Sequence, residues 1–190
     1  VHCAAKLRVA LKDKLLLFTF RTKAEGGKVA LSHEEYLHFI RVVLATDCAD
    51  LIDIEFFTAG AELPALIEEA HTAGAAVVCS SHDFHKTPPR AELVSRMVAM
   101  QRAGADLPKL AVMPQSRTDV LELLAATAEM ADRHPETPII TMSMGALGAV
   151  SRLSGEALGS AMTFANPGQA SAPGQVSLDI VNEVLDALHL

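Results

Sequence analysis

Short apolar segments recur along the chain, and longer stretches with a helical alternation of apolar and polar residues separate them. Continuous apolar strands that alternate with helices are typical of a parallel sheet buried on both faces. The pattern therefore predicts an α/β fold of six strand–helix units. The six expected strands are residues 15–20, 51–57, 75–79, 110–113, 139–142 and 160–164.

Several of the amphipathic stretches begin with recognisable helix-start signals. The signals are a capping box at Ser32–Glu35 before residues 36–44, Pro64 before residues 65–73, and Ser116 before residues 120–130. Two further helices are expected at the ends, over Val1–Leu11 and Ser177–Leu190. Between the last strand and the last helix, Asn166–Gly174 is rich in Gly and Pro and forms a loop long enough to be functional.

Two architectures fit these elements: a doubly wound open sheet, and a TIM barrel that lacks two of its eight strand–helix units. Polar residues near the ends of the expected strands favour the barrel, because the loops after barrel strands converge on one face. They are Arg21, Glu25, Asp53, Glu55, His82, Arg152, Ser171 and Gln175. The sequence contains no glycine-rich nucleotide-binding turn. We therefore predict one TIM-barrel domain over residues 1–190, with the first two units of the barrel missing.

Composition narrows the range of partners. A formal charge of −7 and a pI near 5.6 argue against a nucleic-acid or anionic-membrane surface. The three cysteines are far apart and odd in number, so reduced thiols in the cytoplasm are expected. No apolar stretch approaches the ~18 residues of a membrane span, and the N-terminal residues do not resemble a signal peptide.

Lys109 opens an otherwise apolar segment, and His82 follows the preceding apolar segment. Burial disfavours an ammonium ion and lowers its pKa, which leaves a free amine that can attack a carbonyl carbon. The imidazole of His82 could then transfer protons. Asp53 and Glu55 alternate along one strand and face the same side, where two carboxylates are costly unless they are paired.

Each candidate taken alone also has an ordinary structural interpretation. Lys109 fits a strand-edge lysine whose stem covers apolar surface, and His82 fits a hydrogen-bonded loop histidine. Arg21 with Glu25 fits a surface ion pair, and Arg152 fits a helix C-terminal cap. No metal site is predicted, because the histidines near His82 lack a further ligand at a suitable spacing.

Five motifs in order resemble the type I 3-dehydroquinate dehydratases. They are Phe18-Thr19-Phe20-Arg21-Thr22-Lys23-Ala24-Glu25-Gly26-Gly27, Asp53-Ile54-Glu55, Ser81-His82-Asp83-Phe84-His85-Lys86-Thr87-Pro88, Pro108-Lys109-Leu110-Ala111-Val112-Met113-Pro114 and Ser171-Ala172-Pro173-Gly174-Gln175. The resemblance covers essentially the whole chain. It implies a TIM barrel and the third step of the shikimate pathway, in which 3-dehydroquinate loses water to give 3-dehydroshikimate.

The resemblance also implies a role for each site residue. Lys109 would form an imine with the substrate ketone, His82 would act as the acid and base, and Glu25 would orient His82. The residues that match substrate-binding positions are Arg21, Arg152, Ser171 and Gln175. No cofactor is implied, and members of the family are commonly homodimers.

The chain departs from the family at its start, because the resemblance places two further strand–helix units before Val1. One of them carries a Glu-Xaa-Arg motif that contacts substrate. We therefore expect the 190-residue chain alone to be weakly active or inactive. Two alternatives are a class I aldolase-type Schiff-base lyase, and a non-catalytic remnant that binds a cyclic hydroxy-acid or a partner chain.

Overall fold

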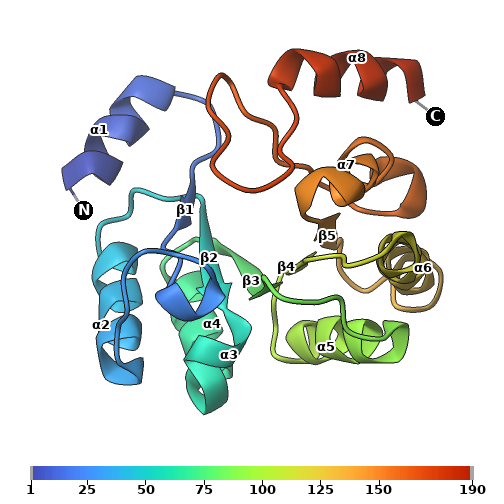
Figure 1. The fold of residues 1–190 in the computed structure, drawn as a ribbon. Coiled ribbons are helices and arrows are strands. Elements are labelled where there is room, and N and C mark those ends of the chain that lie inside the picture. Colours follow the sequence, from blue (N-terminus) through green and yellow to red (C-terminus); the bar gives the residue numbers. More distant parts are fainter. Residues whose placement is uncertain (1, 189–190) are drawn as a thin grey trace. The chain divides into compact units, whose positions relative to one another are not determined.

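The computed structural model describes residues 2–188, which fall into two compact units. The first unit contains Val1–Ser81 and Met100–Leu107, and the second contains His82–Ala99 and Pro108–Leu190. Figure 1 traces both units from α1 in blue to α8 in red.

The first unit is built on parallel strands. Its elements are α1 (His2–Leu11), β1 (Leu17–Thr19), the 3-10 helix η1 (Lys23–Glu25), α2 (His33–Leu44), β2 (Leu51–Glu55), α3 (Phe56–Ala59), η2 (Gly60–Glu62), α4 (Leu63–Thr72) and β3 (Ala76–Asp83), whose last two residues belong to the second unit. Strand β2 pairs in parallel with both β1 and β3. Asp53 lies opposite Val78 and Glu55 opposite Ser80, so the register fixes which side chains of β2 and β3 can meet.

The second unit repeats the strand–helix alternation. Its elements are most of α5 (Arg90–Arg102), most of β4 (Leu107–Val112), α6 (Arg117–Arg133), β5 (Ile140–Ser143), α7 (Gly145–Leu153), η3 (Glu156–Leu158) and α8 (Leu178–Leu188). Strands β4 and β5 pair in parallel, with Lys109 opposite Ile140. Helices α6 and α7 pack against β5. The core between them includes Leu110, Leu123 and Met130, none of which exposes any surface.

The helix-start signals identified in the sequence are confirmed. The Ser32 hydroxyl accepts a hydrogen bond from the Glu35 amide at 3.2 Å, and the Glu35 carboxylate accepts the Ser32 amide at 2.8 Å, which completes the capping box before α2. The Ser116 hydroxyl accepts the Asp119 amide and so caps the start of α6, without a reciprocal capping box. The two terminal helices are present, although Val1 and residues 189–190 lie outside the described part of the chain.

The expected sixth strand, residues 160–164, is replaced by a single parallel bridge between Ile139 and Ser160. The backbone amide of Thr141 donates to the Ser160 hydroxyl at 3.1 Å instead of to a strand carbonyl. Serine side chains that bind nearby backbone groups compete in this way with a regular ladder. The described residues therefore form five named strands, one fewer than the pattern predicted.

Two strands are longer than their apolar segments. Strand β3 continues to Asp83, so His82 lies in the strand and does not follow it. Strand β4 begins at Leu107, so Lys109 is its third residue, although the apolar segment alone placed it at the edge. Within residues 2–188, no helix is both long enough and apolar enough to cross a membrane.

Candidate active site

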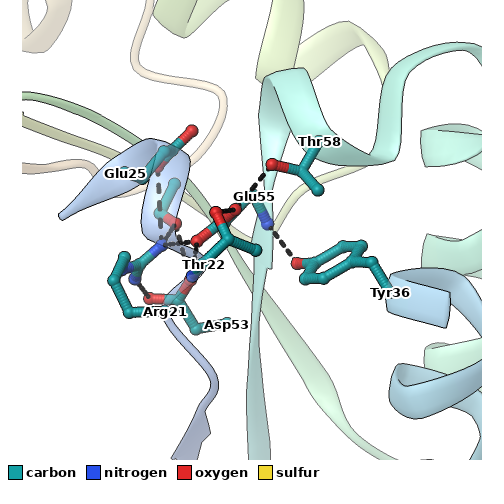
Figure 2. A network of polar contacts seen from close by, with 8 residues as sticks. Arg21, Thr22, Glu25, Tyr36, Asp53, Glu55 and Thr58 are labelled. Atoms are coloured by element: carbon teal, nitrogen blue, oxygen red, sulfur yellow. Dashed lines mark hydrogen bonds and ion pairs between the residues drawn. The ribbon is translucent and has the colours of Figure 1, made fainter. Parts of the chain in front are cut away.

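The guanidinium of Arg21 is surrounded by carboxylates in the first unit (Figure 2). One terminal nitrogen, Nη2, donates to Asp53 Oδ2 at 2.8 Å, and the other, Nη1, donates to Glu55 Oε1 at 3.0 Å. Nη1 also donates to Ser80 Oγ at 3.0 Å and lies 3.5 Å from Glu25 Oε2. Asp53 and Glu55 expose no surface, and Arg21 supplies the ion-pair partner that two inward carboxylates need.

Glu55 receives further donors from the turn after β1 and from α3. Its carboxylate accepts the Thr22 amide at 2.8 Å, the Thr22 hydroxyl at 2.7 Å and the Thr58 hydroxyl at 2.6 Å. The backbone amide of Glu55 itself donates to the Tyr36 hydroxyl at 2.8 Å. These hydrogen bonds give the buried Glu55 its polar partners and fix the loop that carries Arg21.

Burial and the charges of this cluster raise the pKa values of three groups in or beside it. Burial by itself would lower the pKa of Arg21, but the nearby Asp53 and Glu55 outweigh it, and the pKa is raised. Burial also raises the pKa of Tyr36. The pKa of the Cys79 thiol is raised by burial and by the field of Asp53 and Glu25.

Glu25 lies in η1 and is 5 % exposed. A tight turn places it there: the Gly27 amide donates to the Thr22 carbonyl at 2.7 Å, and Gly26 has a φ of 91°. A Cβ atom on Gly27 would lie 1.8 Å from the Arg21 carbonyl oxygen, so only glycine fits. The turn therefore directs Arg21 and Glu25 toward each other.

Lys109 and His82 both belong to the second unit. Lys109 is 6 % exposed, and its Nζ lies 4.7 Å from the centroid of the Phe164 ring. His82 is half-buried near the end of β3. The chain turns sharply after it, because Asp83 Oδ1 accepts the backbone amides of His85 at 2.8 Å and Lys86 at 3.0 Å.

Arg152 lies in the last turn of α7 and is 2 % exposed. Its guanidinium donates to Met142 Sδ at 3.3 Å and to the Pro173 carbonyl at 3.3 Å, while the buried Nε has no hydrogen-bond partner. Within the part of the chain that the structure describes, no carboxylate pairs with Arg152. Burial lowers its pKa accordingly. A buried guanidinium with an unused donor is suited to an anionic ligand.

Ser171 and Gln175 lie in the loop that leads into α8, drawn in orange-red in Figure 1. Gln175 Oε1 accepts the Ser171 amide at 2.7 Å and the Ser171 hydroxyl at 3.2 Å. Arg152 contacts the same loop through Pro173.

The structure thus groups the predicted residues by unit. It pairs Arg21 with Glu25 in the first unit, and it links Arg152 to the loop of Ser171 and Gln175 in the second. Lys109 and His82 lie in this second unit. The proposed contact between Glu25 and His82 stays a prediction.

A family model described as type I 3-dehydroquinase matches residues 1–190. The 3-dehydroquinate dehydratase of Klebsiella pneumoniae is 52% identical over 184 residues, which cover 97% of this chain and 73% of that protein. The chain belongs to the type I 3-dehydroquinase family. A solved type I enzyme from Clostridium difficile matches 99% of this chain and 74% of its own, with a TM-score of 0.94 and 46% identity. The Geobacillus kaustophilus dehydratase gives a TM-score of 0.93 at 40% identity and covers 98% of this chain and 72% of its own.

Membership of the type I family decides between the two architectures. The fold is that of a TIM barrel, and the open doubly wound sheet is excluded. Among residues 2–188, no group of three or more His, Cys, Asp or Glu side chains is arranged to hold a metal ion.

Several residues that complete the polar networks of this family member were not predicted from the sequence. Ser80 and Thr58 hold the carboxylates around Arg21, and Asn166 closes the loop before α8. Ser80 could have been found, because two inward carboxylates require partners on the neighbouring strand. The only sequence feature that pointed to Asn166 was its position at the start of the Gly- and Pro-rich loop.

Proposed function

We propose that this chain is a hydro-lyase that dehydrates 3-dehydroquinate to 3-dehydroshikimate in the shikimate pathway, which leads to the aromatic amino acids. The observation that carries the proposal is a buried lysine, Lys109, in a strand of a chain that matches the type I family over residues 1–190. The relatives support it by their activity, since they are 3-dehydroquinate dehydratases. The Clostridium difficile structure contains covalently modified comenic acid, which is consistent with a nucleophile in that enzyme.

Lys109 is assigned as the nucleophile. Its amine adds to the substrate ketone, and loss of water from the adduct gives a protonated imine. The imine draws electrons from the adjacent carbon and so acidifies its C–H bond. At 6 % exposure, Lys109 is largely shielded from solvent, which protects the imine from premature hydrolysis.

His82 is assigned as the acid and base. It removes the proton from the carbon next to the imine, and the resulting enamine expels the hydroxyl group one carbon further on, which His82 protonates to water. Hydrolysis of the conjugated imine then releases 3-dehydroshikimate and regenerates Lys109. We assign Glu25 to orient His82, as carboxylates do for other catalytic imidazoles.

Substrate binding is assigned to Arg152, Ser171, Gln175 and Arg21. Arg152 is suited to the substrate carboxylate, because its buried Nε is unpartnered and no carboxylate of the described chain pairs with it. Ser171 and Gln175 provide a hydroxyl and an amide in the same loop whose Pro173 carbonyl contacts Arg152. Arg21 still has N–H groups available for a ligand hydroxyl beyond those that bind Asp53, Glu55 and Ser80.

Three further parts of the proposal concern the environment of the enzyme. The imine serves as the electron sink, so the reaction as proposed requires no cofactor or metal. The cysteine usage supports a cytoplasmic location, and Cys48 and Cys79 are free thiols. The family resemblance supports a homodimer built from a single barrel domain.

Turnover of 3-dehydroquinate tests the proposal, because the conjugated enone of the product absorbs in the ultraviolet and the substrate does not. We expect His82→Ala to lower kcat by about 10²–10⁴-fold, the usual contribution of a general acid–base group. His38→Ala, which removes an exposed imidazole on α2, is the matched control and should leave kcat unchanged. Normal turnover by His82→Ala would refute its role. Binding of dehydroquinate without any turnover by the wild-type chain would favour the non-catalytic alternative.

A further inference from the structure

Asn166 closes the loop of residues 167–176 with both its backbone and its side chain. Its amide donates to the Val176 carbonyl at 3.0 Å, and its carbonyl accepts the Leu178 amide at 2.9 Å. Its side-chain Nδ2 donates to the Gln175 carbonyl at 3.3 Å, while Oδ1 accepts the Gly168 amide at 3.3 Å. The residue is 9 % exposed. One side chain therefore bridges Gly168, near the start of the loop, and Gln175, near its end.

This bridge fixes the two loop residues that are assigned to substrate binding, Ser171 and Gln175. Asn166 holds the backbone of Gln175, and the Gln175 side chain in turn accepts two hydrogen bonds from Ser171. The amide of Gln175 also donates to the Ala172 carbonyl at 3.3 Å. The positions of Ser171 and Gln175 thus depend on a chain of contacts that begins at Asn166.

The closed loop docks on α7 through its turn. The Pro173 carbonyl accepts the Gly145 amide at 3.2 Å and Arg152 Nη2 at 3.3 Å. Gly174 has a φ of +75°, and a Cβ atom there would lie 2.3 Å from the Gly145 carbonyl oxygen. The loop can therefore contact Arg152 only because Gly174 has no side chain between its backbone and that of Gly145.

We propose that Asn166 is a positioning residue that preorganises loop 167–176 in its docked form, so that Ser171 and Gln175 meet a ligand held by Arg152. A loop that is already closed loses less conformational entropy when the ligand binds, which raises affinity without a new contact. The inference rests on the proposed function for the identity of the ligand, but the docking of the loop can be measured without activity.

Steady-state kinetics with 3-dehydroquinate give the first test. Asn166→Ala removes both side-chain hydrogen bonds, and we expect KM to rise about tenfold while kcat changes less than twofold. Gly174→Ala disturbs the docking contact without removing a polar group and should give the same pattern. Asn166→Asp keeps the acceptor for Gly168 but loses the donor, and it should fall between Asn166→Ala and the wild type. Asn182→Ala, on the exposed side of α8, is the matched control.

Amide hydrogen exchange gives a second test that needs no turnover. In Asn166→Ala, peptides that cover residues 167–177 should exchange at least fivefold faster than in the wild type, while peptides of β5 and α7 keep their rates. Unchanged exchange in the loop would overturn the inference. Faster exchange throughout the second unit would also overturn it, because Asn166 would then support the fold in general. The exchange rates decide the inference even if the wild-type chain shows no dehydratase activity, so its failure and that of the proposed function are distinguishable.

Discussion

Two arginines of this chain, the half-buried Arg21 and the buried Arg152, occupy opposite electrostatic environments. Arg21 contacts the carboxylates of Asp53, Glu55 and Glu25, and its pKa is raised. Arg152 contacts a methionine sulfur and one backbone carbonyl, and burial lowers its pKa. Both guanidinium groups stay charged at neutral pH, because arginine titrates far above it.

The difference separates a cation whose charge is balanced by protein carboxylates from one whose charge is available to an anionic ligand. The charge of Arg21 is balanced by side chains on β2, so removing Arg21 leaves buried carboxylates without their cation. The charge of Arg152 lacks such a partner among the described residues, so a ligand carboxylate would complete its environment. The two sites should therefore respond to mutation in opposite ways.

The largest expected effect is a loss of stability in Arg21→Met. The substitution leaves Asp53 and Glu55 buried without their cation, and the loss of one partner from a buried ion pair typically costs about 3–5 kcal/mol. Urea denaturation at pH 7 would measure the free energy of unfolding. Arg117→Met, at an exposed position of α6, is the control. A change below about 1 kcal/mol in Arg21→Met would contradict the structural role of this arginine.

Arg152→Met should show the opposite pattern. It removes a buried charge that lacks a carboxylate partner, so the free energy of unfolding should change by less than about 1 kcal/mol or increase. Substrate affinity should fall by about 10–100-fold, the value of hydrogen bonds to a charged group. Isothermal titration with 3-dehydroquinate would measure the affinity. Unchanged affinity would remove Arg152 from the substrate site.

Tyr36→Phe probes the pH dependence of the Arg21 cluster. Burial raises the pKa of Tyr36, so the stability that the neutral phenol contributes is complete below its unfolded pKa of about 10 and is lost as pH rises further. The phenylalanine should abolish this alkaline loss. At pH 7 it should cost about 1–3 kcal/mol, because the buried Glu55 amide loses its acceptor. Unfolding curves from pH 7 to 11 for both proteins would show whether the alkaline slopes differ.

The smallest expected effect is that of Ser80→Ala. Ser80 accepts from Arg21 and donates to Asp53 Oδ1 at 2.5 Å, and its loss should cost about 1 kcal/mol. Ser154→Ala serves as the control, because it removes a hydroxyl that donates only to the Val150 carbonyl at the end of α7. Equal unfolding midpoints for the two variants would mean that Ser80 does not hold the cluster together.

The local pattern of the sequence predicted most of the elements. Apolar segments located five strands, and the capping signals at Ser32 and Ser116 located helix starts, because these features depend on residues a few positions apart. The pattern was wrong for residues 160–164, where a serine side chain replaces part of the backbone ladder. It also predicted that β3 ends at residue 79 and that β4 begins at residue 110. In the structure β3 continues to Asp83 and β4 begins at Leu107.

Only those contacts of the site that lie within a single sequence motif could be predicted. Arg21 and Glu25 are four residues apart in one motif, and their pairing follows from a local turn. The contacts of Arg21 with Ser80 and of Glu55 with Tyr36 depend on strand register and helix packing between distant segments. A hydrophobic pattern carries no information about which polar side chains meet across such distances.

Borohydride reduction in the presence of 3-dehydroquinate, followed by peptide mass spectrometry, tests the central claim that Lys109 forms an imine with the substrate. The account predicts a reduced substrate adduct on the peptide that contains Lys109, an unchanged adduct in Lys28→Ala, where an exposed lysine is removed, and no adduct in Lys109→Ala. An adduct that persists in Lys109→Ala, or that maps to another lysine in the wild type, would contradict the assignment.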